Sequence, residues 1–192
     1  MTNRSRPERQ LLFVQGAGER VHDDWDSKLV ASLRAELGPD YDVRYPRMPD
    51  EADPSYARWT AALEQELALL ADGAIVVGHS VGGTFLIRSL AEHAPERPLG
   101  AIILIAAPFV GDGGWQTTEW QPQHARGEQL PAGVPIHLFH GLADTTVPVS
   151  HAELYAQMIP QARLHRLADR DHQLNNDLSE VAAAIRILYA TV

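Results

Sequence analysis

The 192-residue sequence predicts an α/β protein, a three-layer α/β/α sandwich built around a mostly parallel, six-stranded sheet. The first observation is that short apolar runs, typical of buried strands, alternate along the whole chain with amphipathic runs typical of helices. The second is that every connection between successive strands contains a helix or a long loop, which parallel strands require. The third is the length, which suits one domain with a sizeable core. We therefore expect a single domain over residues 1–192, with residues 1–9 flexible.

The first half of the chain supplies three of the expected strands and three helices. Strands are expected at 11–14, 41–45 and 74–77, and helices at 25–37, from Asp53 onward, and at 80–93. The helix at 25–37 has an apolar stripe with four-residue spacing and ends at Gly38-Pro39, a stop signal. Asp53 and Pro54 suit the N-cap and the first position of the next helix. The run at 74–77 is apolar throughout, as in a strand covered on both faces.

The second half supplies three more strands, two helices and one long loop. Strands are expected at 101–106, 136–140 and 163–167, and helices from Ser150 onward and at 178–189. Ser150 and Glu153 have the spacing of a capping box, and Leu154 and Met158 are expected to point inward. The segment 107–133 is longer than a connection needs to be. Because it leaves the carboxyl edge of the sheet, where such folds bind ligands, we expect it to cover the site.

The composition argues against several classes of function. A net charge of -9 and a pI near 5.4 disfavour phosphate backbones and anionic lipid surfaces, so we expect neither nucleic acid nor membrane as a partner. The absence of cysteine removes disulfides, thiolate metal sites and cysteine nucleophiles. The polar N-terminus does not fit the pattern of a signal peptide, so none is expected, and no apolar run approaches the ~20 residues of a membrane span. These features favour the cytoplasm.

The strongest local motif is Gly78-His79-Ser80-Val81-Gly82, which fits the pattern G-x-S-x-G between an expected strand and an expected helix. A serine in such a sharp turn is strained, and the turn closes only if the residues two before and two after it lack side chains. The Ser80 hydroxyl then stands at a helix N-terminus, where N–H groups favour a developing negative charge. The alternative is a glycine-rich turn that only allows close packing.

Asp144 is the candidate acid. It lies just beyond the expected strand at 136–140, on the same edge of the sheet as Ser80. A loop aspartate after a strand is more often a turn residue or a helix cap, so the position alone is weak evidence. Asp112 is the competing acid, but its Gly-Asp-Gly-Gly surroundings are typical of a turn.

His172 is the candidate base among nine histidines. It lies in a loop directly after the last strand, whereas His165 lies inside that strand and His79 fills a variable position of the elbow, where local packing is expected. His137 and His140 lie three apart on one strand, hence on opposite faces, and make poor joint metal ligands. No metal site is expected.

The chain order Ser80, Asp144, His172 is that of hydrolases with a nucleophile elbow, and all three residues fall at one end of one expected sheet. On these motifs the chain resembles the α/β-hydrolase superfamily over essentially its whole length. Its small size is similar to that of the serine hydrolases related to retinoblastoma-binding protein 9 and the YdeN group. It departs from many of these relatives at Gln15, where they carry His before Gly.

The resemblance implies a minimal α/β-hydrolase fold and a serine hydrolase that cleaves a small carboxylic ester through an acyl-enzyme on Ser80. His172 would take the serine proton, Asp144 would orient the imidazole, and the N–H groups of Ala17 and Val81 would form the oxyanion hole. No cofactor is implied.

The expected covering loop offers three aromatic candidates for the substrate pocket, Phe109, Trp115 and Trp120. Their alternative role is to pin the loop to the body of the protein. The absence of a large cap segment favours a small ester as substrate. Two alternatives stay open: an acyl transferase, thioesterase or amidase with the same triad, and a protein-binding module with a hydrolase fold.

Overall fold

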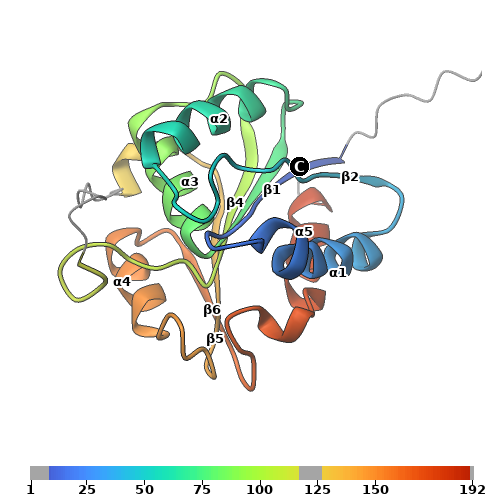
Figure 1. Cartoon of the computed structure of the whole chain (residues 1–192). Coiled ribbons are helices and arrows are strands. Elements are labelled where there is room, and N and C mark those ends of the chain that lie inside the picture. Colours follow the sequence, from blue (N-terminus) through green and yellow to red (C-terminus); the bar gives the residue numbers. More distant parts are fainter. Residues whose placement is uncertain (1–8, 117–126, 191–192) are drawn as a thin grey trace, which may run out of the picture.

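A single six-stranded sheet forms the centre of the protein (Figure 1). The computed structural model describes residues 9–116 and 127–190. All neighbouring strands pair in parallel, in the order β2-β1-β3-β4-β5-β6. The strands are β1 Arg9–Val14, β2 Tyr41–Arg44, β3 Ala74–His79, β4 Leu99–Ile105, β5 Ile136–Gly141 and β6 Arg163–Leu167. The fold class expected from the sequence is confirmed.

Within the described residues, five α-helices cover the two faces of the sheet. They are α1 Ser27–Leu37, α2 Tyr56–Ala68, α3 Ser80–Glu92, α4 Ser150–Met158 and α5 Ser179–Ala190. Helices α1 and α5 pack on one face, and α2, α3 and α4 pack on the other (Figure 1). None of the helices in the described ranges is long and apolar enough to cross a membrane.

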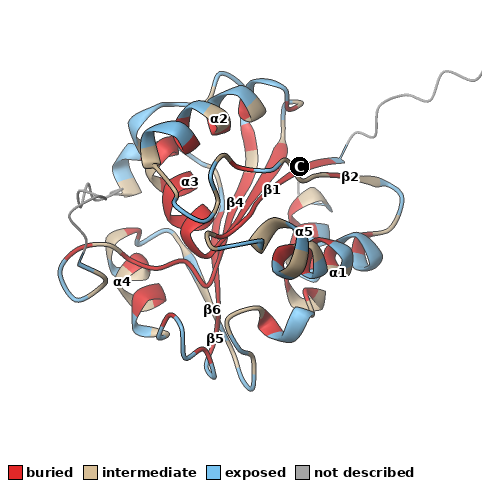
Figure 2. Cartoon of the chain, viewed as in Figure 1, coloured by how far each residue is buried: buried red, intermediate tan, exposed pale blue. Residues whose placement is uncertain are grey.

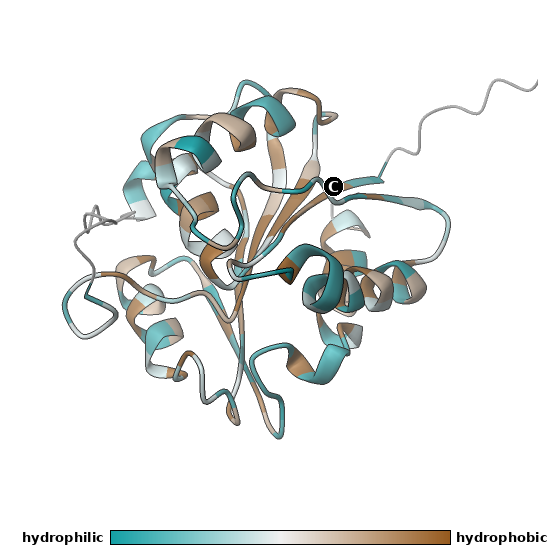
Figure 3. Ribbon diagram, in the orientation of Figure 1, coloured by the Kyte–Doolittle hydropathy of each residue, from teal (hydrophilic) through white to brown (hydrophobic). Residues whose placement is uncertain are grey.

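Alternate residues of each strand supply the two cores. In β1, Leu12 and Val14 pack with the α2–α3–α4 layer, whereas Leu11 and Phe13 pack with α1 and α5. This division follows from the two-residue period of a strand. Figure 2 shows the buried strands between helices whose outer faces are exposed, and Figure 3 shows the same division in hydropathy. Both faces are covered, which explains why the strands are nearly continuous apolar runs.

Several expected boundaries were wrong. Arg9, assigned to a flexible N-terminus, is the first residue of β1. The N-cap position of the second helix is Ser55 and not Asp53, and its side chain makes no capping bond. The chain first makes a turn in which the Asp53 N–H donates to the Asp50 carbonyl oxygen. Ser150 begins α4 as its first residue, and the N-cap position is Val149. Leu154 and Met158 pack against the core, as expected, beside the buried Tyr155.

The sheet order creates the ligand crevice. Strand β1 lies between β2 and β3, so the winding of the chain reverses between β1 and β3. Ligands in open α/β sheets bind beyond the carboxyl ends of the strands at such a switch point. The register aligns Val14 of β1 with Gly78 of β3, which brings the loop after β1 next to Ser80.

Candidate active site

Ser80 occupies a strained turn between β3 and α3. Its φ angle is 50°, a left-handed conformation that a residue with a side chain adopts at a cost. Glycine makes the turn possible: a Cβ on Gly82 would stand 2.0 Å from the Gln15 carbonyl oxygen, and one on Gly78 would stand 2.5 Å from the Cα of Gly83. The spacing of the G-x-S-x-G motif is therefore a steric requirement of this turn.

The structure brings Ser80, His172 and Asp144 into one hydrogen-bonded row. The Ser80 Oγ lies 3.0 Å from Nε2 of His172, and Nδ1 of His172 lies 2.8 Å from Oδ2 of Asp144. A carboxylate only accepts, so Nδ1 carries the hydrogen and Nε2 is free to accept the serine proton. This is the arrangement that a general base requires.

Asp144 is buried and held by four donors. Its Oδ1 accepts N–H bonds from Thr146 and Val147, both at 2.8 Å, and its Oδ2 faces His172 and, at 3.4 Å, Nε2 of His140. Burial by itself raises the pKa of the carboxyl group, but the hydrogen bonds from His140, His172 and the Val147 N–H outweigh it and leave the pKa well below the ordinary value. Asp144 is therefore ionised at neutral pH.

His140 is a supporting residue that the sequence argument did not identify. It is 1% exposed, and its Nε2 donates to the Val147 carbonyl oxygen over 2.7 Å. Because a carbonyl oxygen only accepts, Nε2 carries a hydrogen, which also faces the Asp144 carboxylate. Its position at the end of β5, four residues before Asp144, was the available signal.

The His172 imidazole is kept neutral by its surroundings. Burial lowers its pKa, the hydrogen bond and charge of Asp144 act in the opposite direction, and the net shift is downward. A neutral imidazole beside a serine hydroxyl is available as a base at neutral pH.

A pocket of about 520 Å³ opens onto this row. Its wall contains the apolar side chains of Ala17, Val21, Trp25, Val81 and Trp115, together with Gly16, Asp26, His79, Ser80, Thr146, His172 and Gln173. Ala17 and Val81, the expected oxyanion residues, thus border the same space as Ser80. Val81 is the second residue of α3, where N–H groups have no partner inside the helix. None of the described residues in this wall is lysine or arginine.

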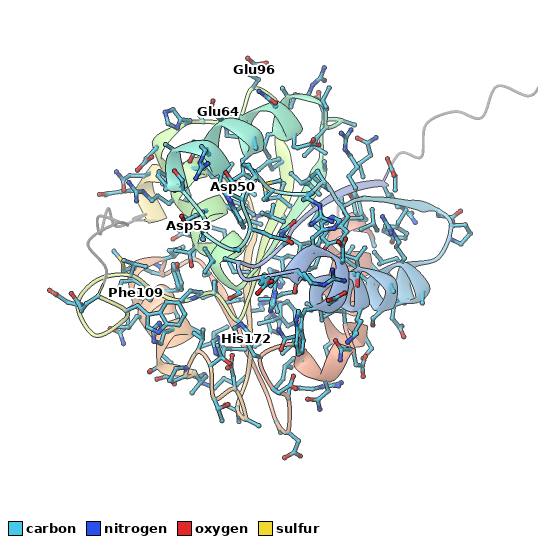
Figure 4. The ribbon with its side chains drawn as sticks, in the orientation of Figure 1. Asp50, Asp53, Glu64, Glu96, Phe109 and His172 are labelled. Atoms are coloured by element: carbon cyan, nitrogen blue, oxygen red, sulfur yellow. The ribbon has the colours of Figure 1, made fainter. Side chains whose placement is uncertain are left out.

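The three aromatic residues expected at the pocket have different outcomes. Trp115 lines it, whereas Trp120 lies outside the described residues. Phe109 does not line it: the side chain is 5% exposed in the core, in edge-to-face contact with Tyr155 at 5.2 Å between ring centroids. Figure 4 shows Phe109 at the side of the molecule, apart from His172. The expectation for Phe109 failed because its Pro108-Phe109 segment turns the ring inward, over α4.

The loop after β1 is held by Gln15, the residue at which the sequence departs from many relatives. The Gln15 side chain accepts the Met48 N–H over 3.0 Å and donates to Glu51 over 2.6 Å. Gly18 donates its N–H to the Glu51 carbonyl oxygen. The glutamine therefore fixes the loop that carries Ala17 against the segment after β2.

No group of three or more His, Cys, Asp or Glu side chains able to hold a metal ion occurs in residues 9–116 and 127–190. A strained serine, an imidazole and a buried carboxylate in a row, at the carboxyl edge of a parallel sheet, are the features of hydrolases with the α/β-hydrolase fold.

The comparisons with known proteins agree with this class. Residues 11–178 match the family model described as Serine hydrolase, so the chain belongs to that family. The YdeN gene product of B. subtilis superposes with a TM-score of 0.74 at 20% identity, over 95% of this chain and 99% of that one. Mouse alpha/beta hydrolase domain-containing protein 10 superposes with a TM-score of 0.68 at 18% identity, over 95% and 90% of the two chains. These likenesses show the fold.

One curated relative is a non-heme haloperoxidase of Rhodococcus erythropolis, 25% identical over 155 residues, which are 72% of this chain and 47% of the relative. The chain therefore spans about half the length of that protein. Together these findings confirm the expected superfamily and the likeness to the YdeN group.

Proposed function

We propose that this chain is a carboxylesterase-like serine hydrolase that cleaves small, uncharged carboxylic esters through an acyl-enzyme on Ser80. The observation that carries the proposal is the continuous row from the Ser80 Oγ through His172 to Asp144, with separations of 3.0 and 2.8 Å. The row begins in the wall of a pocket of about 520 Å³, within the size range of small-molecule sites.

The reaction follows from the positions of these atoms. The Ser80 oxygen attacks the acyl carbon while its proton passes to Nε2 of His172, and the Asp144 carboxylate stabilises the imidazolium. The oxyanion accepts hydrogen bonds from the N–H groups of Ala17 and Val81. His172 returns the proton to the leaving alcohol, then removes a proton from water as the water attacks the acyl-enzyme. His172 then gives this proton to the Ser80 oxygen as the bond to the acyl carbon breaks, and the carboxylic acid leaves.

The pocket wall supports the choice of substrate. The indoles of Trp25 and Trp115 and the side chain of Val21 offer apolar contact to an acyl or alkyl group. The ionisable groups in the described wall already have partners: Asp26 is hydrogen-bonded to His79, and His172 to Asp144. A substrate with its own charge would lack a counter-charge there, so an uncharged ester is favoured.

Labelling with a fluorophosphonate probe tests the nucleophile. We expect wild type to be labelled at neutral pH, Ser80→Ala not to be labelled, and Ser150→Ala, which changes an exposed serine outside the pocket, to be labelled like wild type. Labelling that survives Ser80→Ala would contradict the proposal.

A substrate panel tests the chemistry. p-Nitrophenyl esters of increasing acyl length, a matched thioester and a matched anilide should show the highest kcat/KM for short esters. A preference for the thioester or the anilide would replace the esterase assignment by another hydrolase with the same triad. Labelling without turnover of any ester, thioester or amide would favour an acyl transferase. A lack of both labelling and turnover would favour a binding module.

A further inference from the structure

A second histidine–aspartate pair lies beside the first. His79, the variable residue of the elbow, has a side chain that is 2% exposed, and its partner Asp26 is fully buried. Nδ1 of His79 lies 2.9 Å from Oδ2 of Asp26, and Nε2 lies 3.1 Å from the main-chain oxygen of His172. The ring thus makes two specific polar contacts, beyond the local packing expected from the sequence.

Both contacts require a hydrogen on the ring. A carboxylate and a backbone carbonyl group are acceptors, so both nitrogens of His79 act as donors and the ring is an imidazolium. The alternative, a protonated Asp26 beside a neutral imidazole, would place the proton on the weaker base. Burial opposes the charge of His79, but the charge and hydrogen bond of Asp26 prevail and raise its pKa above the ordinary value.

The positive charge of His79 also explains how the Asp26 carboxylate can be buried. Its Oδ2 accepts both the His79 ring N–H and the Gly16 N–H, the latter over 2.7 Å, while its Oδ1 is buried without a hydrogen-bond partner among the described residues. A buried carboxylate with one unbonded oxygen is stable only beside a compensating charge. His79 supplies that charge.

The pair joins three loops that carry separate parts of the site. Asp26 holds Gly16, the residue before Ala17 in the loop after β1. His79 precedes Ser80 in the elbow and donates to the backbone of His172 in the loop after β6. The two histidine rings stand 5.0 Å apart between centroids. We propose that Asp26 and His79 are positioning residues, a fixed ion pair that ties these loops together and places a permanent positive charge beside His172.

The proposed role of the ion pair depends on the proposed hydrolase function in one respect only, namely that His172 acts as a base. The groups that face the His172 ring are the Asp144 carboxylate with His140 behind it, the Ser80 hydroxyl and the His79 imidazolium. Asp144 favours the protonated form of His172, and a cation at His79 opposes it. Removal of that cation therefore raises the pKa of His172. Since His172 acts unprotonated, the acidic limb of kcat/KM then moves to higher pH.

The pH profile of ester hydrolysis is the first test, in wild type, His79→Gln and Asp26→Asn. At about 5 Å and an effective dielectric constant of about 20, we expect the midpoint of the acidic limb to rise by roughly two pH units in His79→Gln. Asp26→Asn should move it in the same direction, because His79 loses the partner that keeps it charged. The control His165→Gln changes a histidine that lies in β6 outside the pocket wall, and should leave the midpoint unchanged. A lower kcat with an unmoved midpoint in both variants would mean a merely structural pair and would overturn the proposal.

Nitrogen-15 NMR of the imidazoles is the second test and needs no turnover. The spectra are recorded in the Ser80→Ala background. The His79 signals are those that disappear when His79→Gln is added. If the His79→Gln protein does not fold, they are those that shift in Asp26→Asn. We expect both nitrogens of His79 to be protonated at pH 7, where a free imidazole is largely neutral. A neutral ring at pH 7 would overturn the proposal even if Ser80 hydrolyses esters. A protonated ring in a chain that is neither labelled nor active would refute the hydrolase function and leave the ion pair standing.

Discussion

The amide variant Asp144→Asn tests the catalytic row most directly because it keeps the shape of the side chain. Oδ1 of Asp144 accepts two backbone N–H bonds, from Thr146 and Val147, both at 2.8 Å. In the variant the amide oxygen has to stay at this position, since an NH₂ group there would face two fixed backbone donors at 2.8 Å. At the other position the His140 donor is more distant, at 3.4 Å, and the His172 ring can change its tautomer. The NH₂ group is therefore directed toward Nδ1 of His172.

This orientation forces the wrong form of the imidazole. Facing a donor, Nδ1 of His172 must give up its hydrogen, which moves to Nε2, and Nε2 then cannot accept the Ser80 proton. The same substitution in the serine-protease triad lowers kcat about 10⁴-fold. We expect a loss of about 10³- to 10⁴-fold in kcat, about 4 to 5.5 kcal/mol of transition-state stabilisation, with KM nearly unchanged.

The measurement is the steady-state hydrolysis of p-nitrophenyl acetate by wild type, Asp144→Asn and Asp112→Asn at a pH on the plateau of the wild-type profile. Asp112 is exposed on the loop after β4 and serves as the matched control. Circular dichroism establishes that the variants are folded. A loss of less than tenfold in Asp144→Asn, or an equal loss in Asp112→Asn, would refute the reasoning.

Three further predictions concern His172, Gly82 and Trp115. In wild type, the acidic limb of kcat/KM should have its midpoint below the ordinary imidazole value of 6.5, because burial lowers the pKa of His172; a midpoint above 7 would contradict this. Gly82→Ala should lower the free energy of unfolding by at least about 3 kcal/mol in urea titrations, because its Cβ would meet the Gln15 carbonyl oxygen at 2.0 Å, whereas Gly133→Ala, with φ 76° and open space around it, should cost about 1 kcal/mol. Trp115→Ala should lower kcat/KM for short esters about tenfold and shift the preference toward longer acyl chains, and an unchanged chain-length profile would exclude Trp115 from substrate contact.

The sequence predicted the sheet and the positions of the catalytic candidates because both depend on local rules. Strands appear as apolar runs, the elbow as a pentapeptide whose glycines are sterically necessary, and Asp144 and His172 as polar residues placed just after strands. Parallel pairing then brings the ends of those strands to one edge. No side-chain contact had to be known for this step.

The errors arose where more than one local solution was available. Asp53 and Ser55 are both good N-cap residues, and only the turn at Asp50 decides for Ser55. Phe109 follows a strand as the catalytic candidates do, but the direction of its side chain depends on the packing of α4 against it. The Asp26–His79 pair joins residues 53 positions apart, neither of which belongs to a pattern that marks the other.

The two histidine–aspartate pairs differ in the group that the second ring nitrogen faces, and this difference separates their roles. Beyond His172 stands the Ser80 hydroxyl, which can donate, so that ring can rest neutral and take up a proton during the reaction. Beyond His79 stands a carbonyl oxygen, which can only accept, so no neutral form of that ring can donate to both this oxygen and an ionised Asp26. One pair can therefore cycle its charge while the other keeps it. To exchange these roles, the group that faces the second ring nitrogen would have to change, whereas the carboxylate could stay the same.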